Sequence, residues 1–188
     1  MMMKNKLLIV GAGGLGRMTM ESAIAQYECY FLDDNYQKGT IICDCEVVGS
    51  ISDLELLYPK YKNLIVAIGN NILREKLYKH AIHIGYCVPT IINDTAYVSN
   101  YCEIGSGTII LSNASIQNGA IIKNGVVITA NVEIHHDCEV DDFALIYSNT
   151  TIRTNARVGK RVKIGSNVSI SNDVIINDDE IINNGDVL

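Results

Sequence analysis

Branched aliphatic residues recur at every sixth position through the second half of the chain. The series is Ile92, Val98, Ile104, Ile110, Ile116, Ile122, Ile128, Ile134, Val140, Ile146, Ile152, Val158, Ile164, Ile170, Ile176, Ile182 and Leu188. Two residues before most of them stands a small or medium side chain, such as Ala96, Cys102 or Ala114. Positions i and i−2 lie on the same side of a strand, so both rows can face one interior. A fixed short period of this kind predicts a repeat architecture.

The two positions that follow each aliphatic residue are typical of sharp turns. The first is usually Asn, Ser or Asp, as at Asn100 and Ser106, and the second is rich in Gly, Asn and Asp. These residues adopt a positive φ at little cost. We therefore predict short strands wound into a parallel β-helix, with three strands and about eighteen residues per turn. Glu180 and Asp186 break the inner row, so we expect the last turn to expose charge.

The first 88 residues have a different pattern, in which strand and helix signals alternate. Strands are predicted at 6–10, 29–32 and 64–68, and helices at 17–26 and 72–84. Residues 38–52 are rich in β-forming residues, but their pairing stays open. This order predicts a small Rossmann-like α/β domain of βαβ type. Because the pattern changes within residues 85–89, we place the domains at 1–88 and 89–188.

Charge and composition exclude several classes of function. The 188 residues carry a net charge of −6 and no Lys/Arg cluster, which argues against a nucleic-acid partner. The opening MMMKNKLLIV is too short an apolar run for a signal peptide or membrane span, so we expect a cytoplasmic protein without a membrane partner. The six cysteines should then be reduced, with Cys102 and Cys138 in the core. Cys43 and Cys45 have no second pair at zinc-ligand spacing, so we expect no structural metal.

A glycine-rich loop, GAGGLG at 11–16, follows the first predicted strand and precedes the first predicted helix. In this context backbone N–H groups and the helix N-terminus can hold a diphosphate. Asp33 stands about twenty residues further on, where a carboxylate can bond a ribose hydroxyl. The loop predicts a nucleotide site, and a purely structural tight turn is the alternative.

One corner of the repeat breaks the pattern, because His136 is the only imidazole in the first corner row. It is either a tolerated surface residue or a general base on a rigid corner. Asp137 is either a turn former or the carboxylate that orients this ring. His135 should diverge from His136, and the other two histidines, His80 and His83, lie on a predicted helix. We therefore expect no metal-dependent catalysis.

Four segments together resemble a known family along nearly the whole chain. They are VGAGGLG at 10–16, CYFLDDN at 29–35, VAIGNNILREKLY at 66–78 and HHDCEVDDF at 135–143. The chain resembles the sugar O- or N-acetyltransferases of sialic-acid and bacillosamine type, often called NeuD-like or PglD-like. The resemblance implies that the β-helix is left-handed, that the protein is a homotrimer, and that acetyl-CoA binds in the groove between neighbouring subunits.

The resemblance also implies roles for individual residues. Those near a nucleotide-linked amino sugar are Gly13, Gly14 and Leu15 at the diphosphate, Asp33 and Asp34 at the uridine or its equivalent, and Gly69 in the pocket wall. His136 is implied as the base, with Asp137 as its acidic partner. Thr154, one turn after His136, and Ser166 are implied to lie near the CoA chain.

The expected function is an acetyl-CoA-dependent N-acetyltransferase that acts on the amine of a UDP-linked or similar amino sugar. O-acetylation of a sialic-acid-like sugar is the alternative within this class. A non-catalytic scaffold or sugar-nucleotide sensor stays open because Leu145 stands where the family commonly has a second histidine. A further departure from the family is Asn149, which stands at the position of a glycine. An NAD-dependent oxidoreductase is less favoured, since the first domain supplies little more than one mononucleotide half.

Overall fold

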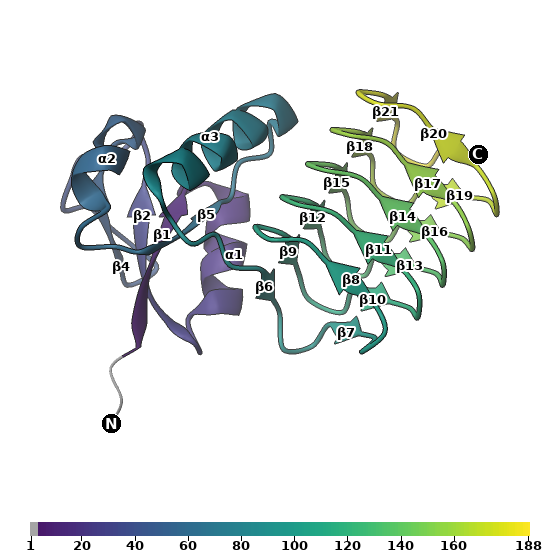
Figure 1. Cartoon of the computed structure of the whole chain (residues 1–188), viewed down its shortest axis with the longest axis horizontal. Helices are drawn as coiled ribbons and strands as arrows, with labels where there is room; N and C mark the ends of the chain where they lie inside the picture. Colours follow the sequence, from purple (N-terminus) through teal and green to yellow (C-terminus); the bar gives the residue numbers. More distant parts are fainter. Residues whose placement is uncertain (1–3) are drawn as a thin grey trace. The chain divides into compact units, whose positions relative to one another are not determined.

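The computed structural model describes residues 4–188 and divides into two compact units, the first ending at Pro89 and the second spanning Thr90–Leu188. The first unit combines helices with a sheet, and the second consists of short strands and turns (Figure 1). Within the described part of the chain, no helix is long and apolar enough to cross a membrane.

The first unit is built on a twisted sheet in which β1 (Asn5–Val10) is an inner strand, paired with β2 (Tyr27–Leu32) on one side and β5 (Asn63–Val66) on the other. Within residues 4–89 the strand order is β3-β4-β2-β1-β5, and the other strands are β3 (Ile41–Ile42) and β4 (Cys45–Gly49). Four consecutive residues of β1 are fully buried, as expected for a parallel strand covered on both faces. The open question at 38–52 is settled: β3 and β4 form an antiparallel hairpin, and β4 pairs in parallel with β2.

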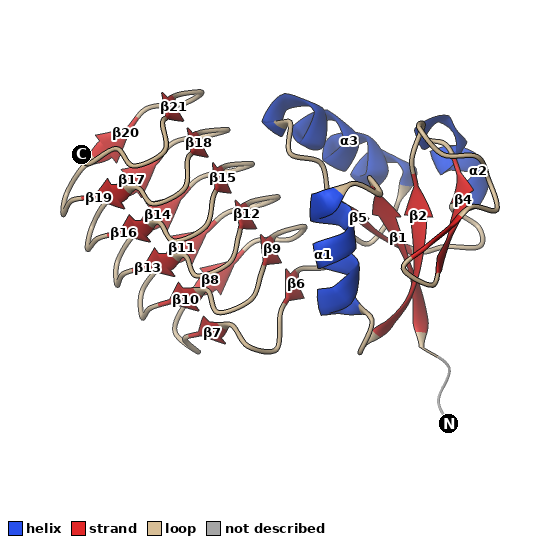
Figure 2. Cartoon of the chain, turned by 180° about the vertical axis from the view of Figure 1, so that it is seen from behind, coloured by secondary structure: helices blue, strands red, loops and turns tan. Residues whose placement is uncertain are grey.

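Helices flank this sheet (Figure 2). They are α1 (Gly14–Ala23), the 3₁₀ turn η1 (Ile51–Asp53), α2 (Leu54–Leu57) and α3 (Asn71–Ile84). The prediction of a first helix at 17–26 was wrong at both ends. The helix begins earlier because Arg17 N–H donates to Gly13 O at 3.0 Å and winds the glycine loop into the first turn, and after Ala23 the chain continues as a turn in which Gln26 N–H donates to Ala23 O at 2.9 Å. The Asn70 side chain caps α3 by accepting from Leu73 N–H at 3.0 Å, and Gly85, at φ +109°, ends it.

The second unit is a left-handed parallel β-helix, which confirms the predicted fold class. Its strands form three parallel sheets, and each residue lies beside the one eighteen positions later, as in Ile116↔Ile134. The six-stranded sheet contains β6 (Ile91–Ile92), β9 (Ile109–Ile110), β12 (Val127–Ile128), β15 (Leu145–Ile146), β18 (Lys163–Ile164) and β21 (Ile181–Ile182). The next contains β7 (Tyr97–Val98), β10 (Ser115–Ile116), β13 (Glu133–Ile134), β16 (Thr151–Ile152) and β19 (Ser169–Ile170). The third contains β8 (Glu103–Ile104), β11 (Ile121–Ile122), β14 (Glu139–Val140), β17 (Arg157–Val158) and β20 (Ile175–Ile176).

The two inward rows form one continuous core along the β-helix. Ile116, Ile134 and Ile152 are fully buried, and so are the small residues between them, such as Ala120. Cys138 belongs to this core, as predicted. Cys102 is half-buried, and its Sγ donates to Gln117 O at 2.8 Å.

The corners adopt the left-handed backbone conformation that their composition predicts. Asn113, Asn131 and Asp137 have φ values of 56°, 58° and 61°. This conformation turns the corner N–H back toward the preceding turn, so that Asp137 N–H donates to Asn118 O at 3.1 Å. At the last turn Glu180 accepts from Asn177 N–H at 3.1 Å, so this half-buried carboxylate bonds its own corner rather than pointing away from it.

A buried threonine provides a test of the stacking. Thr150 Oγ1 donates to Gly165 O at 2.8 Å and accepts from Val168 N–H at 3.2 Å, in a fully buried position. We expect Thr150→Val to destabilise the protein by about 1–3 kcal/mol, because both backbone groups lose this partner in the core. Urea unfolding measures the change. Thr150→Ser keeps the hydroxyl and is the control; equal losses for Val and Ser would contradict the hydrogen-bonding role.

Candidate active site

The glycines of the loop in the first unit have two different functions in the structure. Gly16 has no room for a side chain, because a Cβ there would overlap Gly11 O, and a Cβ on Gly11 would lie 2.9 Å from Ala67 O. These two glycines let the loop pack against the sheet. A Cβ on Gly13 or Gly14 would meet no atom within 4 Å, so this side of the loop is open. The loop is therefore both a tight structural turn and an accessible N-terminus of α1.

This open side faces a pocket of about 400 Å³ at the carboxyl ends of the parallel strands. All six residues predicted to bind substrate in this unit line it: Gly13, Gly14, Leu15, Asp33, Asp34 and Gly69. The sequence reading missed other lining residues, among them Asn35, Ile51 and Leu73. Asn35 and Ile51 follow closely after β2 and β4, so the rule that ligands bind beyond the carboxyl ends of parallel strands could have found them.

Asp33 joins the glycine loop to the end of β2. Its Oδ2 accepts from Ala12 N–H at 2.7 Å, and its Oδ1 accepts from Asn35 N–H at 2.8 Å and from the Asn35 amide at 3.0 Å. Burial alone would raise the pKa of Asp33, but these hydrogen bonds together hold the pKa of this carboxyl below its ordinary value. Asp34 Oδ1 accepts from Ile51 N–H at 2.8 Å, which fixes the loop after β4.

In the second unit, His136 lies at the corner between β13 and β14. We call the stack of corners 117–120, 135–138, 153–156 and 171–174 the histidine edge. His136 Nδ1 lies 2.8 Å from Asp137 Oδ2, and its Nε2 lies 3.1 Å from Thr154 Oγ1 on the next turn. A carboxylate accepts this hydrogen bond from Nδ1–H, and in the neutral imidazole that tautomer leaves the lone pair on Nε2. The side chains of His136 and Asp137 are exposed by 52% and 61%, so this corner is open to solvent.

The predicted Asp137–His136 pair is thus in contact, and Thr154 joins it as a third member. The sequence analysis did not predict the contact between Thr154 and His136. The interval of eighteen residues could have indicated it, because residues one turn apart in the β-helix lie one above the other. Beside this corner an open hollow of about 500 Å³ is lined by Asp137, Asn155, Arg157, Asp173 and Ile175.

The other histidines lie outside this arrangement. His135 Nε2 lies 3.4 Å from Glu133 Oε1, and His80 and His83 are exposed on α3. Across residues 4–188, no three His, Cys, Asp or Glu side chains converge in a way that could hold a metal ion.

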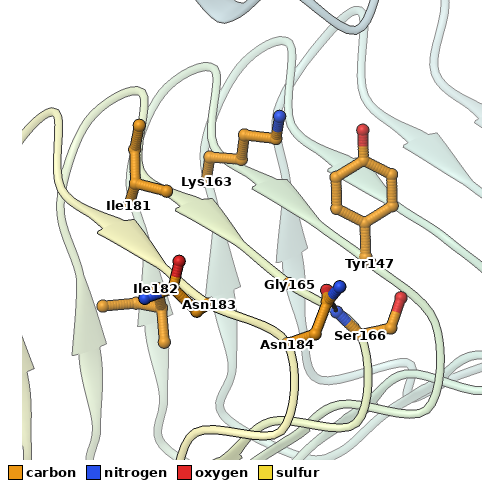
Figure 3. A pocket seen from close by; sticks show the side chains of 8 residues that line it. All are labelled: Tyr147, Lys163, Gly165, Ser166, Ile181, Ile182, Asn183 and Asn184. Atoms are coloured by element: carbon orange, nitrogen blue, oxygen red, sulfur yellow. Dashed lines mark hydrogen bonds between the residues drawn. The ribbon is translucent and has the colours of Figure 1, made fainter.

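Ser166 is the other residue implied to lie near CoA. It lies on a different edge of the three-sided β-helix from His136. We call the corners 129–132, 147–150, 165–168 and 183–186 the serine edge. Ser166 lines a hollow of about 390 Å³ with Tyr147, Lys163 and Asn184 (Figure 3). Lys163 Nζ lies 5.7 Å from the centre of the Tyr147 ring, so a cation and an aromatic ring stand side by side at this hollow. Thr154 and Ser166 therefore do not share one corner of the chain.

The two departures from the resemblance have different structural consequences. Leu145 is fully buried, so this position offers neither a titratable nor a hydrogen-bonding side chain. Asn149 has a φ of 62° and therefore adopts the left-handed backbone that a glycine would adopt there, while its amide donates to Asn167 Oδ1 at 3.2 Å. Asn149 in place of glycine preserves the backbone of its corner. Leu145 in place of histidine removes a titratable side chain from its position.

Comparison with known proteins finds similar structures that cover both units. The family model of the PglD N-terminal domain matches residues 6–81. The acetyltransferase domain of PglB from Neisseria gonorrhoeae FA1090 is 30% identical with a TM-score of 0.94, over 98% of this chain and 91% of that chain. The same domain in complex with acetyl coenzyme A is 30% identical with a TM-score of 0.91, over 97% and 89%. A histidine-to-alanine variant of GDP-perosamine N-acetyltransferase from Caulobacter crescentus, in complex with CoA and GDP-perosamine, is 25% identical with a TM-score of 0.76, over 98% and 88%. No curated protein sequence matches the chain.

The hydrogen bonds of Asp33 predict a pH-dependent contribution to stability. We expect Asp33→Asn to destabilise the protein by about 1–3 kcal/mol at pH 7, because an amide cannot accept all of these hydrogen bonds. The folded pKa is lowered, so this stability is present above the unfolded value of about 3.9 and is lost as pH falls through the lower, folded pKa. Urea unfolding at neutral and acidic pH measures the difference, which should narrow in acid. A difference that stays constant would show that the ionised carboxylate is not the cause.

Proposed function

The chain belongs to the NeuD-like and PglD-like family of sugar acetyltransferases, and from this premise we propose that it N-acetylates a nucleotide-linked amino sugar, with His136 as general base. Acetyl-CoA is the acetyl donor. The observation that carries the proposal is the chain of contacts from Asp137 through His136 to Thr154 on the histidine edge. It supports acyl transfer because it leaves an oriented imidazole with a lone pair on an accessible corner.

We place the nucleotide part of the acceptor in the pocket of the first unit. The N–H groups of the first turn of α1 have no intrahelical acceptor, and no acidic residue lies in that turn, so this end of the helix suits a diphosphate. Gly13 and Gly14 leave the close approach open, and Gly69, which lines the same pocket, does so too. In this proposal Asp33 and Asp34 lie near the nucleoside, and Asp33 also holds the loop that binds the diphosphate.

The chemical step requires a base, because a protonated amine is not a nucleophile. In the proposed step the neutral amine attacks the thioester carbonyl while His136 Nε2 takes its proton. Asp137 stabilises the imidazolium that forms, since its carboxylate already accepts from Nδ1. The tetrahedral intermediate collapses, the carbon–sulfur bond breaks, and the thiolate of CoA takes up the proton. The products are the acetamido sugar and CoA.

Thr154 occupies the position that the acceptor needs. In the structure its hydroxyl is the partner of His136 Nε2, at 3.1 Å. We propose that the amine replaces this hydroxyl when the acceptor binds, so that Thr154 holds the ring in place until then. From the same position Thr154 can contact the acyl end of the CoA chain, as the family resemblance implies.

We propose that acetyl-CoA bridges two copies of the chain in a homotrimer. Thr154 and Ser166 lie on different edges of the β-helix, so one bound acetyl-CoA can meet equivalents of both where the edges of neighbouring copies come together. The hollow at Ser166 supports this placement: Lys163 is a cation suited to phosphate, and Tyr147 offers a ring for the adenine (Figure 3).

Replacement of the base separates catalysis from a scaffold or sensor function. We expect His136→Asn to lower kcat by about 10²–10⁴-fold, the range for loss of a general base, with little change in the KM for acetyl-CoA. Release of the CoA thiol in the presence of a UDP- or GDP-linked amino sugar is the measurement. His135→Asn, on the same corner, is the matched control and should stay active. Equal activity of wild type and His136→Asn would contradict the proposal and favour the scaffold.

The bridging site predicts a linked pair of results. Sedimentation should give three copies per particle, and Lys163→Gln should raise the KM for acetyl-CoA about tenfold, equivalent to about 1.4 kcal/mol. The variant should not change the KM for the nucleotide sugar. If Lys163 contacts the 3′-phosphate of CoA, Lys163→Gln should raise the KM less for acetyl-3′-dephospho-CoA than for acetyl-CoA. A fully active monomer, or an unchanged KM, would contradict this placement of acetyl-CoA.

A further inference from the structure

The turn that precedes the His136 corner places a glycine directly beside Asp137. β10 pairs with β13 and β11 with β14, in a register that joins each residue to the one eighteen positions later. Gly119 is therefore the stacking neighbour of Asp137 on the histidine edge. Both have a left-handed backbone, with φ values of 75° and 61°.

The carboxylate of Asp137 occupies the space that a side chain at 119 would fill. A Cβ on Gly119 would overlap Asp137 Oδ1 and lie 3.3 Å from its Cγ. The backbone N of Asp137 would be 3.5 Å from that Cβ, which is an ordinary contact. The conflict thus falls on the end of one side chain, which can rotate away, and not on the backbone.

The equivalent corners of the β-helix show what happens without such a glycine. On the serine edge Asn131 donates to Asn149 Oδ1 at 3.1 Å, and Asn149 donates to Asn167 Oδ1 at 3.2 Å. Further down the histidine edge Asn155 donates to Asp173 Oδ1 at 3.1 Å. At these positions side chain stacks on side chain from turn to turn. Asp137 instead lies over Gly119, and its other oxygen reaches His136 Nδ1 at 2.8 Å.

We propose that Gly119 is a positioning residue for His136, which acts by leaving room for the Asp137 carboxylate. This inference rests on the proposed function for its catalytic consequence. A turn former such as Asn would satisfy the backbone at this corner equally well, as Asn131 and Asn155 do with φ values of 58° and 60°. What only glycine satisfies is the orientation of the carboxylate, and through it the tautomer of His136.

The first test measures the ring directly and does not depend on activity. Long-range ¹H–¹⁵N spectra of the ¹⁵N-labelled protein, with the His136 signals assigned from His136→Asn, should show a protonated Nδ1 and an unprotonated Nε2 in the wild type. Gly119→Ala should shift these signals toward a mixture of tautomers. Gly185→Ala is the matched control, because Gly185 has a φ of 79° at an equivalent corner and its Cβ would meet nothing within 4 Å. A ring signal unchanged in Gly119→Ala, or changed equally in Gly185→Ala, would overturn the proposal.

The second test follows acetyl transfer. We expect Gly119→Ala to lower kcat by about a hundredfold, the cost of misplacing a catalytic group by about 1 Å, with the KM for acetyl-CoA nearly unchanged. In an Asp137→Gly background, which lacks the carboxylate, Gly119→Ala should cause no further loss. A full additional loss in that background would overturn the proposal. If the wild type transfers no acetyl group, the proposed function fails, while the ring signals still decide whether Gly119 positions His136.

Discussion

Register between successive turns of the β-helix is the constraint on which the rest of the second unit depends. Parallel backbone hydrogen bonds join each strand to the strand one turn later, as in His135 N–H to Ile152 O at 2.9 Å. The left-handed corners add bonds in the opposite direction, such as Asp137 N–H to Asn118 O. Both sets fix an interval of eighteen residues. Because of that interval Gly119 stacks on Asp137, and Asp137 and Thr154, from successive turns, contact one imidazole.

The same rigidity explains why a corner is a suitable place for a base. Around the His136 corner the inner rows are fully buried, as at Ile134, Cys138 and Ile152, so the strands that flank this corner cannot shift without opening the core. Outward side chains at the corner contribute little to that core and are free to vary. His136 can therefore replace a turn-forming residue at little structural cost, while the backbone beneath it is held from both sides. The first unit uses a different solution, in which the buried carboxylate of Asp33 fixes a glycine loop.

Much of this architecture could be predicted from the sequence, because the signals involved are periodic. Rows of Ile and Val with small residues two positions earlier indicated the core, and Asn, Gly and Asp indicated the left-handed corners. The start of α1 was missed because glycine is a poor helix former, and the bond from Arg17 to Gly13 overrides that preference. The sequence could not predict which glycines of the loop are needed for packing and which leave space for a ligand, since only the folded backbone shows where a Cβ would collide. The first group is Gly11 and Gly16, and the second is Gly13 and Gly14. For the same reason the sequence indicated His136 and Asp137, and indicated Gly119 as a turn residue, but did not indicate that Gly119 leaves room for the Asp137 carboxylate.

Transfer of a labelled acetyl group tests the central claim most directly. Acetyl-CoA carrying ¹³C at the carbonyl is incubated with the protein and a panel of UDP- and GDP-linked amino sugars, and the product is examined by ¹³C NMR. The account predicts that, with at least one acceptor, the label appears in an amide carbonyl bonded to the sugar nitrogen. An ester carbonyl on a sugar hydroxyl would contradict N-acetylation, and release of free acetate alone, or no product with any acceptor, would contradict the proposed transfer.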